Sequence, residues 1–392
     1  MLTLLALISL GIWLFLIFGW AGFWRADQRL PEKTTGGNAQ TAPPVPSSII
    51  AIVPARDEAE TIGACITSLL NQTYDGALSI ILVDDGSADG TAEMALSAAR
   101  QSRHPDALHI VTASPLHPGW SGKLWALDQG LTHAQKTLPA PAFFWLTDAD
   151  IVHAPDTLSR LCAQAAQHDL DLVSLMVRLH CERFWERLLV PAFIFFFQLL
   201  YPFRAVNDPA SPVAAAAGGC ILISANALAR IGGIAAVHDR LIDDVALASA
   251  VKQAGFKIWL GLGDTSHSLR KAAGLADLWH MVSRTAYTQL RYSPFLLIGT
   301  LAGLGLTYIA PPMLLLSAPW HGSWPAALLG AAGWAAMTAT YRPTLRYYGR
   351  PWWQGLALPG VAALYAAMTV HSAINHGRGK ISRWKGREYT RP

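Results

Sequence analysis

The chain has 392 residues, 52% of them hydrophobic, which is enough for one sizeable catalytic domain together with membrane segments. A formal net charge of only +4, with Lys and Arg gathered near the ends of apolar stretches, argues against a nucleic-acid-binding protein. Four widely separated cysteines without metal-binding spacing indicate small packed residues in a reducing compartment, and 15 tryptophans are typical of a protein that meets a bilayer interface.

The first element is an apolar stretch, Leu2–Trp24, that contains no charged side chain. About 20 apolar residues cross a bilayer as a helix, so residues 1–24 are predicted to be a transmembrane anchor. A cleaved signal peptide is the alternative, but a basic start and a small-x-small cleavage site are missing and the apolar core is too long. Arg25 and Arg29 follow directly, which predicts that the downstream domain is cytoplasmic. Residues 25–47 form a predicted linker.

From residue 48 onward, apolar strands alternate with helical stretches in the βαβ manner of an α/β domain with a mostly parallel sheet. An apolar stripe at helical spacing between Ile62 and Leu70 marks one of the helices. In an open parallel sheet, ligands bind beyond the carboxyl ends of the strands. The predicted strands are Ile49–Val53, Ser79–Val83, Leu108–Thr112, Phe143–Thr147 and Leu172–Met176.

Acidic side chains follow three of these strands. Glu58 comes after the first strand, Asp84 and Asp85 come after the second, and Asp148-Ala149-Asp150 comes after the fourth. Carboxylates on adjacent loops repel one another unless a cation or hydrogen-bond donors lie between them. One alternative stays open for the second loop, where Asp84, Asp85 and Asp89 would only shape a turn and cap the helix that follows.

The segment Asp148-Ala149-Asp150 directly follows a buried strand. If the backbone stays extended, residues two apart point to the same side, so both carboxylates converge on one hard cation and Ala149 keeps the space open. A divalent cation held by one or two carboxylates usually completes its coordination with substrate phosphates and water. The segment therefore predicts a metal–diphosphate site.

Lys123 lies at the start of a predicted helix that begins at Ser121. Backbone amides at a helix N-terminus and a nearby cation together favour an anion, so we expect Lys123 to contact the donor's phosphates. A solvated surface lysine is the alternative.

Further apolar segments occupy the second half of the chain. Residues 188–203 are apolar, aromatic and flanked by arginines, which predicts a helix lying in the membrane surface; a buried core helix is the alternative. Residues 291–376 hold three longer apolar stretches, Pro294–Ser317, Pro325–Tyr341 and Gly355–Ile374.

The charges around these three stretches restrict their topology. Residues 342–354 and the tail, 377–392, are basic, and both favour the cytoplasmic side. Three full crossings cannot satisfy both if the catalytic domain is also cytoplasmic. One stretch is then re-entrant or interfacial, with a break at Pro311-Pro312 or at Leu358-Pro359-Gly360.

The ordered motifs resemble the family 2 glycosyltransferases of GT-A fold. The resemblance rests on four segments: Val53-Pro54-Ala55-Arg56-Asp57-Glu58 (V-P-A-x-N-E), Val83-Asp84-Asp85-Gly86-Ser87 (V-D-D-G-S), Asp148-Ala149-Asp150 (D-x-D) and Leu241–Leu247 (E-D-x-x-L, with Asp243 in place of Glu). Other segments are similar to the hopene-associated glycosyltransferases of the HpnB family, namely Gly119–Ala126, Pro191–Phe193, Tyr201–Phe203, Gly218–Cys220 and Trp384–Arg387.

The resemblance implies an inverting transferase that uses a nucleotide sugar, with UDP as the expected nucleotide, and works in hopanoid lipid synthesis at the bacterial inner membrane. The implied donor-binding residues are Pro54, Arg56, Glu58, Asp84, Asp85, Lys123, Asp148, Ala149 and Asp150. Asp148 and Asp150 would hold Mg²⁺ or Mn²⁺ on the diphosphate. Arg56 stands where many relatives have Tyr, which places a stacking contact there in doubt.

The resemblance also implies that Asp244 is the general base and that Asp243 is a residue that caps the helix or positions the base. The alternative is that both acids simply open a helix over 245–254. Gly218 and Gly219 would give the backbone room to approach sugar or acceptor, or would form an ordinary turn. Gln289 and Arg291 belong to an imperfect Q-x-x-R-W element, so Arg291 would reach the diphosphate or acceptor, or would lie at the membrane surface.

We therefore expect a catalytic domain over 48–290, with a nucleotide-sugar half (48–180) and an acceptor half (181–290). The expected partners are a nucleotide sugar, a lipid acceptor of polyprenoid type such as a hopanoid, and the bilayer. Alternative acceptors are a carotenoid, a ceramide-like lipid or a glycan. A membrane-bound nucleotide-sugar binder without turnover is the alternative outside enzymes.

Overall fold

The computed structural model describes residues 1–31, 46, 48–379, 383–384 and 387–388. Most of the predicted linker, 25–47, and most of the basic tail, 377–392, lie outside the described residues. The chain divides into two compact units. The sheet unit contains Asp27–His180 and Ala205–Arg270, and the helical unit contains Met1–Ala26, Cys181–Arg204 and Lys271–Lys380. The predicted domain over 48–290 is thus shared between the two units.

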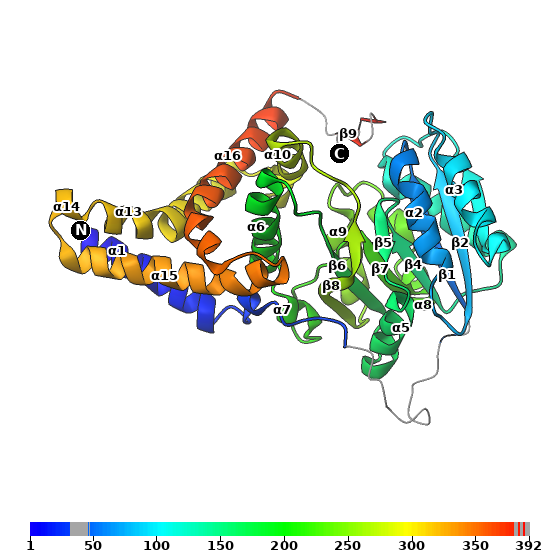
Figure 1. Cartoon of the computed structure of the whole chain (residues 1–392), viewed down its shortest axis with the longest axis horizontal. Helices are drawn as coiled ribbons and strands as arrows, with labels where there is room; N and C mark the ends of the chain where they lie inside the picture. The colour runs from blue at the N-terminus through cyan, green and yellow to red at the C-terminus, as the bar shows by residue number, and fades with distance from the viewer. Residues whose placement is uncertain (32–45, 47, 380–382, 385–386, 389–392) are drawn as a thin grey trace. The chain divides into compact units, whose positions relative to one another are not determined.

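The sheet unit is built on an eight-stranded sheet of order β3-β2-β1-β4-β7-β6-β8-β5 (Figure 1). Strands β3, β2, β1 and β4 are parallel to one another, and β6 is parallel to β8. Strand β7 runs antiparallel to β4 and β6, and β5 runs antiparallel to β8. The strands are β1 Ser48–Ala55, β2 Ala77–Asp84, β3 Leu108–Thr112, β4 Phe143–Thr147, β5 Ile151–His153, β6 Leu172–Arg178, β7 Cys220–Ser224 and β8 Ile258–Ser268.

The predicted α/β class with a mostly parallel sheet is confirmed, and all five predicted strands are present as β1, β2, β3, β4 and β6. Strands β5, β7 and β8 were not predicted. The helices of this unit include α2 Ala59–Leu70, α3 Thr91–Arg100, α4 Gly122–Thr137, α5 Thr157–His168, α8 Ala225–Arg230 and α9 Asp243–Gln253, with short 3₁₀ turns η3 Pro105–Ala107 and η4 Ile234–Val237.

Both faces of the sheet are covered, which is why β1 is apolar on both sides. Ile49, Ala51 and Val53 belong to a core cluster that also contains the buried stripe of α2 between Ile62 and Leu70. The other face of β1 carries α4. A Cβ atom added at Gly130 of α4 would lie 2.7 Å from Ile52 Cγ2, so the glycine lets this helix approach the sheet closely.

In the helical unit, α1 spans Leu2–Phe18 and is shorter than the predicted anchor, because the helix ends at Gly19 before a 3₁₀ turn at Phe23–Arg25. The transmembrane role of this 17-residue helix stays a prediction. The remaining elements are α6 Phe184–Leu200, α10 Leu275–Ser283, α11 Ala286–Gln289, α12 Pro294–Leu304, the π turn η5 Gly305–Ile309, α13 Ala310–Leu316, α14 Ala318–His321, α15 Trp324–Tyr347, η6 Trp352–Ala357 and α16 Leu358–Gly377; α7 Phe203–Asn207 lies where the chain passes between units.

Among the described residues, two helical runs are long and apolar enough to cross a membrane, Pro294–Leu316 and Trp352–Gly377. The predicted break at Pro311-Pro312 is absent, because both prolines lie in the first turn of α13, directly after the π turn, where the missing N–H groups cost little. Leu358-Pro359-Gly360 likewise begins α16 after a 3₁₀ turn. Helix α15, which contains the predicted stretch Pro325–Tyr341, is not one of the two runs.

Helix α6 covers residues 188–200 of the segment 188–203 that was predicted to lie in the membrane surface. Eight of its 17 residues are buried within the helical unit, including Leu189 and Phe195. The Phe195 ring packs against the rings of Phe23 and Tyr341, and Tyr365 Oη donates a hydrogen bond to the Leu189 carbonyl. These contacts favour the alternative interpretation, a packed core helix.

Candidate active site

The parallel register of β1 and β2 brings the first two acidic loops together. Pro54 pairs with Val83 across the two strands, so the residues that follow each strand are neighbours. Arg56 Nη1 donates to the main-chain oxygen of Asp85 and lies 3.7 Å from its carboxylate, which is fully buried. Pro54, Arg56 and Asp85 are therefore brought together as predicted.

The other acids of these loops shape the backbone. Asp84 Oδ1 accepts hydrogen bonds from the amide and hydroxyl of Ser87. Asp89 accepts from the amide and hydroxyl of Thr91 at the start of α3, and from the Ala59 amide at the start of α2. Asp84 and Asp89 thus make the turn and cap contacts of the alternative, whereas Asp85 pairs with an arginine; the donor-binding role of Asp84 stays a prediction.

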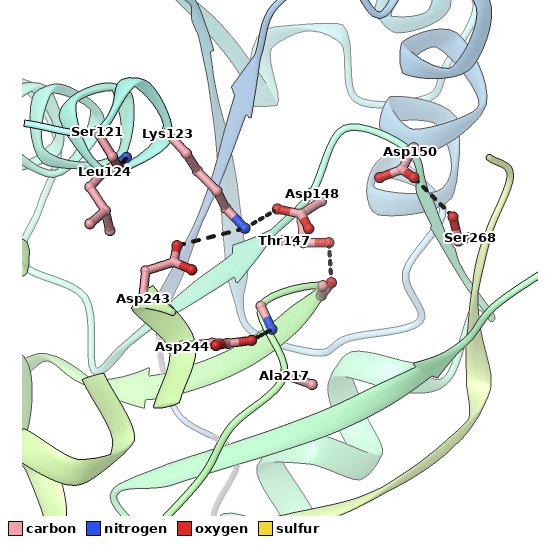
Figure 2. A network of polar contacts seen from close by, with 12 residues as sticks. Ser121, Lys123, Leu124, Thr147, Asp148, Asp150, Ala217, Asp243, Asp244 and Ser268 are labelled. Carbon is pink, nitrogen blue, oxygen red and sulfur yellow. Dashed lines mark hydrogen bonds and ion pairs between the residues drawn. The ribbon is translucent and has the colours of Figure 1, made fainter. Parts of the chain in front are cut away.

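The backbone of Asp148-Ala149-Asp150 turns between β4 and β5, so the predicted extended conformation is wrong. Strand β4 pairs with β7, whereas β5 pairs with β8, and the chain must bend between these two partners. The two carboxylates consequently have different neighbours (Figure 2). Asp148 Oδ1 lies 2.6 Å from Lys123 Nζ, and Asp150 Oδ2 accepts from Ser268 Oγ at 2.9 Å. Ala149 is buried beneath the turn.

Lys123 is the central cation of the site. It lies in the first turn of α4, which begins one residue later than predicted, after the N-cap residue Ser121, whose hydroxyl accepts from the Leu124 amide. Besides its contact with Asp148, the ammonium lies 4.0 Å from Asp243 Oδ2 (Figure 2). Its side chain is 18% exposed, which disfavours the alternative of a solvated surface lysine.

The charges around Lys123 stabilise one another. Burial alone would lower the pKa of Lys123, but the carboxylates of Asp148, Asp243 and Asp244 raise it well above its usual value. Burial raises the pKa of Asp148, Lys123 opposes that rise, and the charge of Asp150 adds to it. The Lys123 ammonium therefore stays charged in this site. A diphosphate, which carries more negative charge than one carboxylate, could compete with Asp148 for it.

Asp244 is the partly buried acid on the other side of Lys123. Its Oδ2 accepts from the Gly218 amide at 3.0 Å, and its Oδ1 accepts from the Val245 amide at 2.8 Å. Burial and the charge of Asp243 raise the pKa of Asp244 and the charge of Lys123 lowers it, with a net value of about 6. This pKa suits a general base at neutral pH.

Asp243 and Asp244 form the first turn of α9, so they open a helix, which begins two residues earlier than predicted. The two carboxylates diverge, as the helical geometry requires: Asp243 faces Lys123, and Asp244 faces Gly218. The helix-opening alternative and a chemical role are therefore compatible, because each acid has a specific partner outside its own helix.

A pocket of about 310 Å³, counting the part open to solvent, lies between α4, α9 and the strand ends. Its polar lining consists of Lys123, Asp243 and Asp244, with the backbone of Gly218. The apolar lining consists of Leu124, Leu127, Leu146, Ile221, Ile234, Val237 and Leu247. Three charged groups thus converge at one end of an otherwise apolar hollow.

The two glycines before β7 have different surroundings. A Cβ atom at Gly218 would lie 3.0 Å from Lys123 Nζ and 3.6 Å from Asp244 Oδ2, so this glycine lets the backbone approach both charged groups. A Cβ at Gly219 would instead meet the side chain of Val177 at 3.0 Å. Gly218 therefore belongs to the site, and Gly219 is a close packing position behind it.

Arg270 is a site residue that the sequence analysis missed. It follows β8, and its guanidinium contacts Glu58 Oε1 at 2.5 Å and Asp150 Oδ2 at 3.2 Å. Burial would lower the pKa of Arg270, but the charges of Asp150 and Glu58 raise it. The one sequence signal for Arg270 is the apolar start of β8, Ile258–Leu262, because β8 brings Arg270 to the same edge of the sheet as Glu58.

Gln289 and Arg291, predicted to bind the acceptor, lie in the helical unit. Gln289 Nε2 donates to Tyr201 Oη at 2.5 Å, and Arg291 has a left-handed backbone, with φ 51°. Their role stays a prediction.

Helix α9 also holds the loop that leads to Gly218. The ammonium of Lys252, in its last turn, donates to the backbone carbonyls of Val206, Asp208 and Val213 at 2.7–2.9 Å, and to that of Ala205 at 3.4 Å. One helix thus fixes this loop at both ends, through Lys252 at one end and Asp244 at the other.

Residues 50–232 match the family model of glycosyl transferase family 2. They form a family 2 glycosyltransferase domain. The predicted enzyme class is thereby confirmed, and the motifs at the ends of β1, β2 and β4 lie inside the matched region. A search of curated proteins found no match.

The domain is also similar to solved structures. Mannosyltransferase PcManGT from Pyrobaculum calidifontis, in complex with GDP-Man and Mn²⁺, is 21% identical with a TM-score of 0.55, and the alignment covers 97% of this chain and 100% of that chain. This likeness and the sheet order confirm the GT-A fold. Glucosyl-3-phosphoglycerate synthase from Mycobacterium tuberculosis, in complex with Mn²⁺, uridine diphosphate and glucosyl-3-phosphoglycerate, is 19% identical over 62% of this chain and 80% of that chain, with a TM-score of 0.41.

Proposed function

We propose that this glycosyltransferase moves a sugar, with inversion, from a nucleoside diphosphate sugar to the hydroxyl of a membrane lipid. The observation that carries the proposal is the pocket in which Asp244, a partly buried acid with a pKa of about 6, faces Gly218 beside the Lys123–Asp148 pair. A direct glycosyl transfer needs a base and a cation that binds phosphate, and Asp244 and Lys123 line the same pocket.

The proposed step is a single displacement at the anomeric carbon. Asp244 removes the proton of the acceptor hydroxyl while that oxygen forms a bond to the anomeric carbon. The bond from that carbon to the diphosphate oxygen breaks, and the nucleoside diphosphate leaves with the electron pair. Because the nucleophile enters opposite the leaving group, the configuration inverts.

The leaving diphosphate carries the developing negative charge, and cations near it stabilise the transition state. Lys123 is placed for this role at the N-terminus of α4, where backbone amides favour an anion. The Lys123 contact with Asp148 holds the ammonium in the absence of donor. Arg270 adds a second positive charge beside Asp150.

The residues fit a divalent cation bound together with the diphosphate. Asp148 and Asp150 supply hard oxygen donors, and the Asp148 side chain is 33% exposed. Among the described residues, no three His, Cys, Asp or Glu side chains gather into a metal site, so Mg²⁺ or Mn²⁺ would need phosphate oxygens to complete its coordination. When bound, the cation neutralises charge on the leaving group. Mn²⁺ in the similar mannosyltransferase supports this assignment.

For the nucleoside, we propose a site made by Pro54, Arg56, Glu58, Asp84 and Asp85 at the ends of β1 and β2. The buried Asp85 carboxylate beside Arg56 supports it. The sequence resemblance favours UDP, whereas the similar mannosyltransferase binds GDP-Man. Both nucleotides therefore belong in the test.

For the acceptor, we propose a lipid, with a hopanoid first among candidates. Two helical runs that are long and apolar enough to cross a bilayer lie in the same chain as the transferase domain, which suits an acceptor drawn from the membrane. Resemblance to the HpnB family, carried by Gly119–Ala126 and Gly218–Cys220, supports the hopanoid. Arg25 and Arg29 support a cytoplasmic catalytic domain at the inner membrane.

Two measurements test the proposal. Calorimetry of the purified protein with Mn²⁺ and either UDP or GDP should show binding of one nucleotide that is lost in Asp148→Asn. Lipid profiling of a deletion strain, complemented with wild type or Asp244→Asn, should show a glycosylated lipid that only the wild-type gene restores. Nucleotide binding with an unchanged lipid profile would point to a glycan acceptor or a binder without turnover, and no binding would refute the donor site.

A further inference from the structure

A buried chain of hydrogen bonds runs directly beneath the Asp148–Asp150 turn. His153, which follows the turn in β5, is 3% exposed, and its two ring nitrogens both have partners. Nε2 lies 2.9 Å from Thr147 Oγ1, on the residue before Asp148, and Nδ1 lies 2.8 Å from Ser266 Oγ on β8. Thr147 Oγ1 in turn lies 2.9 Å from the Gly219 carbonyl oxygen (Figure 2).

These contacts fix the direction of every proton in the chain. A carbonyl oxygen only accepts, so the Thr147 hydroxyl must donate its one proton to Gly219. Toward His153 the same hydroxyl can then only accept, and Nε2 must carry a proton. Burial, with the nearby His267 charge, lowers the pKa of His153 to about 3, so the ring is neutral and Nδ1 must accept from Ser266. The order is Ser266, His153, Thr147, Gly219.

The chain connects the two halves of the site. Thr147 precedes Asp148, whose carboxylate contacts Lys123. Gly219 follows Gly218, whose amide holds Asp244. The His153 amide is fixed as well, by donating to Ser68 Oγ on α2, and its ring lies against Trp145 with centroids 4.6 Å apart. A neutral ring held on all sides is a rigid spacer.

Resting on the function proposed above, we propose that His153, as the Nε2–H tautomer, is a positioning residue. Through Thr147 and Gly219 it sets the distance between Asp148, which binds the sugar donor, and the base Asp244. It contacts neither substrate nor reacting atoms. Its effect therefore falls on the chemical step, because misplacing reacting groups by about 1 Å can cost on the order of 10²-fold in rate.

The first test exchanges the central hydroxyl. Thr147→Val keeps the shape but removes both hydrogen bonds, and should lower kcat on the order of 10²-fold while the KM for the donor and the affinity for UDP or GDP change little. Thr147→Ser keeps the hydroxyl and should restore most of kcat. Thr157→Val is the matched control, because Thr157 is equally buried and donates to the Thr265 carbonyl outside this chain, so its kcat should stay at the wild-type value.

The second test reads the tautomer itself in the full-length, detergent-solubilised protein. In ¹⁵N-histidine spectra, the His153 ring, assigned by its loss in His153→Gln, should show the neutral Nε2–H pattern from pH 5 to pH 9. An Nδ1–H pattern, or titration within that range, overturns the inference without touching the proposed function. So does an active Thr147→Val enzyme with wild-type kcat. A wild-type protein without transfer from any nucleotide sugar instead overturns the proposed function, and this role of His153 with it.

Discussion

Asp244 and Gly218 are joined by a hydrogen bond in which the Gly218 amide donates to Asp244 Oδ2 at 3.0 Å. The other carboxylate oxygen accepts from the Val245 amide of its own helix, so two backbone groups from different segments fix the plane of the carboxylate. Each oxygen retains lone-pair capacity after one such bond. The acid is therefore oriented before an acceptor arrives, while still able to take a proton from the pocket.

Replacing Asp244 by Asn should strongly reduce the rate of transfer. The amide has nearly the same shape but cannot take a proton, so kcat should fall by about 10²- to 10⁴-fold, as for loss of a general base. Nucleotide binding should stay close to the wild-type value, measured by calorimetry with Mn²⁺ present. Asp243→Asn is the matched control, since its carboxylate faces Lys123 and not Gly218, and its kcat should fall less. Wild-type turnover in Asp244→Asn would refute the base assignment.

The activity should depend on pH through Asp244. Its pKa of about 6 means that the carboxyl is protonated at lower pH and cannot accept a proton, whereas above pH 6 it is ionised. Transfer should therefore rise with pH and level off above pH 7, with an acid limb near pH 6 in a kcat profile measured at saturating donor. A limb near pH 4, the ordinary range of an aspartate, would contradict the burial that the structure shows.

Lys123→Met should move that limb upward. The ammonium of Lys123 lowers the pKa of Asp244, as do the amides of Val245 and Gly218, whereas burial and Asp243 raise it. Removing the ammonium therefore takes away one of the lowering effects. The acid limb should shift to higher pH, and donor KM should rise because a phosphate-binding cation is lost. Lys136→Met removes the same charge from the exposed last turn of α4 and should leave the profile unchanged. A Lys123→Met profile that moves to lower pH would be inconsistent with this arrangement.

Gly130→Ala should destabilise the sheet unit. The added methyl would lie 2.7 Å from Ile52 Cγ2 and 2.9 Å from Val83 Cγ2, so α4 would have to move away from the sheet. Overpacking of this kind costs about 1–3 kcal/mol of unfolding free energy. Gly63→Ala in α2 is the control, because its nearest contact would be the Met94 carbonyl at 4.0 Å, and it should stabilise by about 0.4–1 kcal/mol. Denaturation midpoints moving in the same direction for both would refute the packing argument.

Much of the sheet could be predicted from the sequence because β1, β2, β3, β4 and β6 are continuous apolar runs. Strand β5 could not, since its three residues, Ile151–His153, are in a strand only because β8 lies beside them. Strand β8 begins apolar but continues through polar residues from Asp264 to Ser268, which hides it from a pattern search. The burial of α6 likewise could not be predicted, because it depends on helices distant in the sequence. An apolar helix that contacts lipid has the same sequence pattern as one that packs against protein.

The site was predictable where local rules apply and not where tertiary pairing decides. The loops after β1, β2 and β4 and the capped start of α4 follow from strand ends and an N-cap serine. The direction of Asp150 does not, because β5 and β8 set the turn before it. Arg270 lies 212 residues from Glu58, and no sequence spacing connects them. His153 has no local signature either, since its partners come from β4 and β8.

Lys252 occupies a cage of backbone carbonyl oxygens, a ligand type that also binds hard metal ions such as Ca²⁺. Because this cation is covalently part of the chain, treating the enzyme with EDTA cannot remove it, and the loop before Gly218 stays ordered after such treatment. We therefore expect any loss of activity on chelation to report on the cation site proposed at the Asp148–Asp150 turn, and a titration with added Mn²⁺ would test the donor half of the reaction separately from the acceptor half.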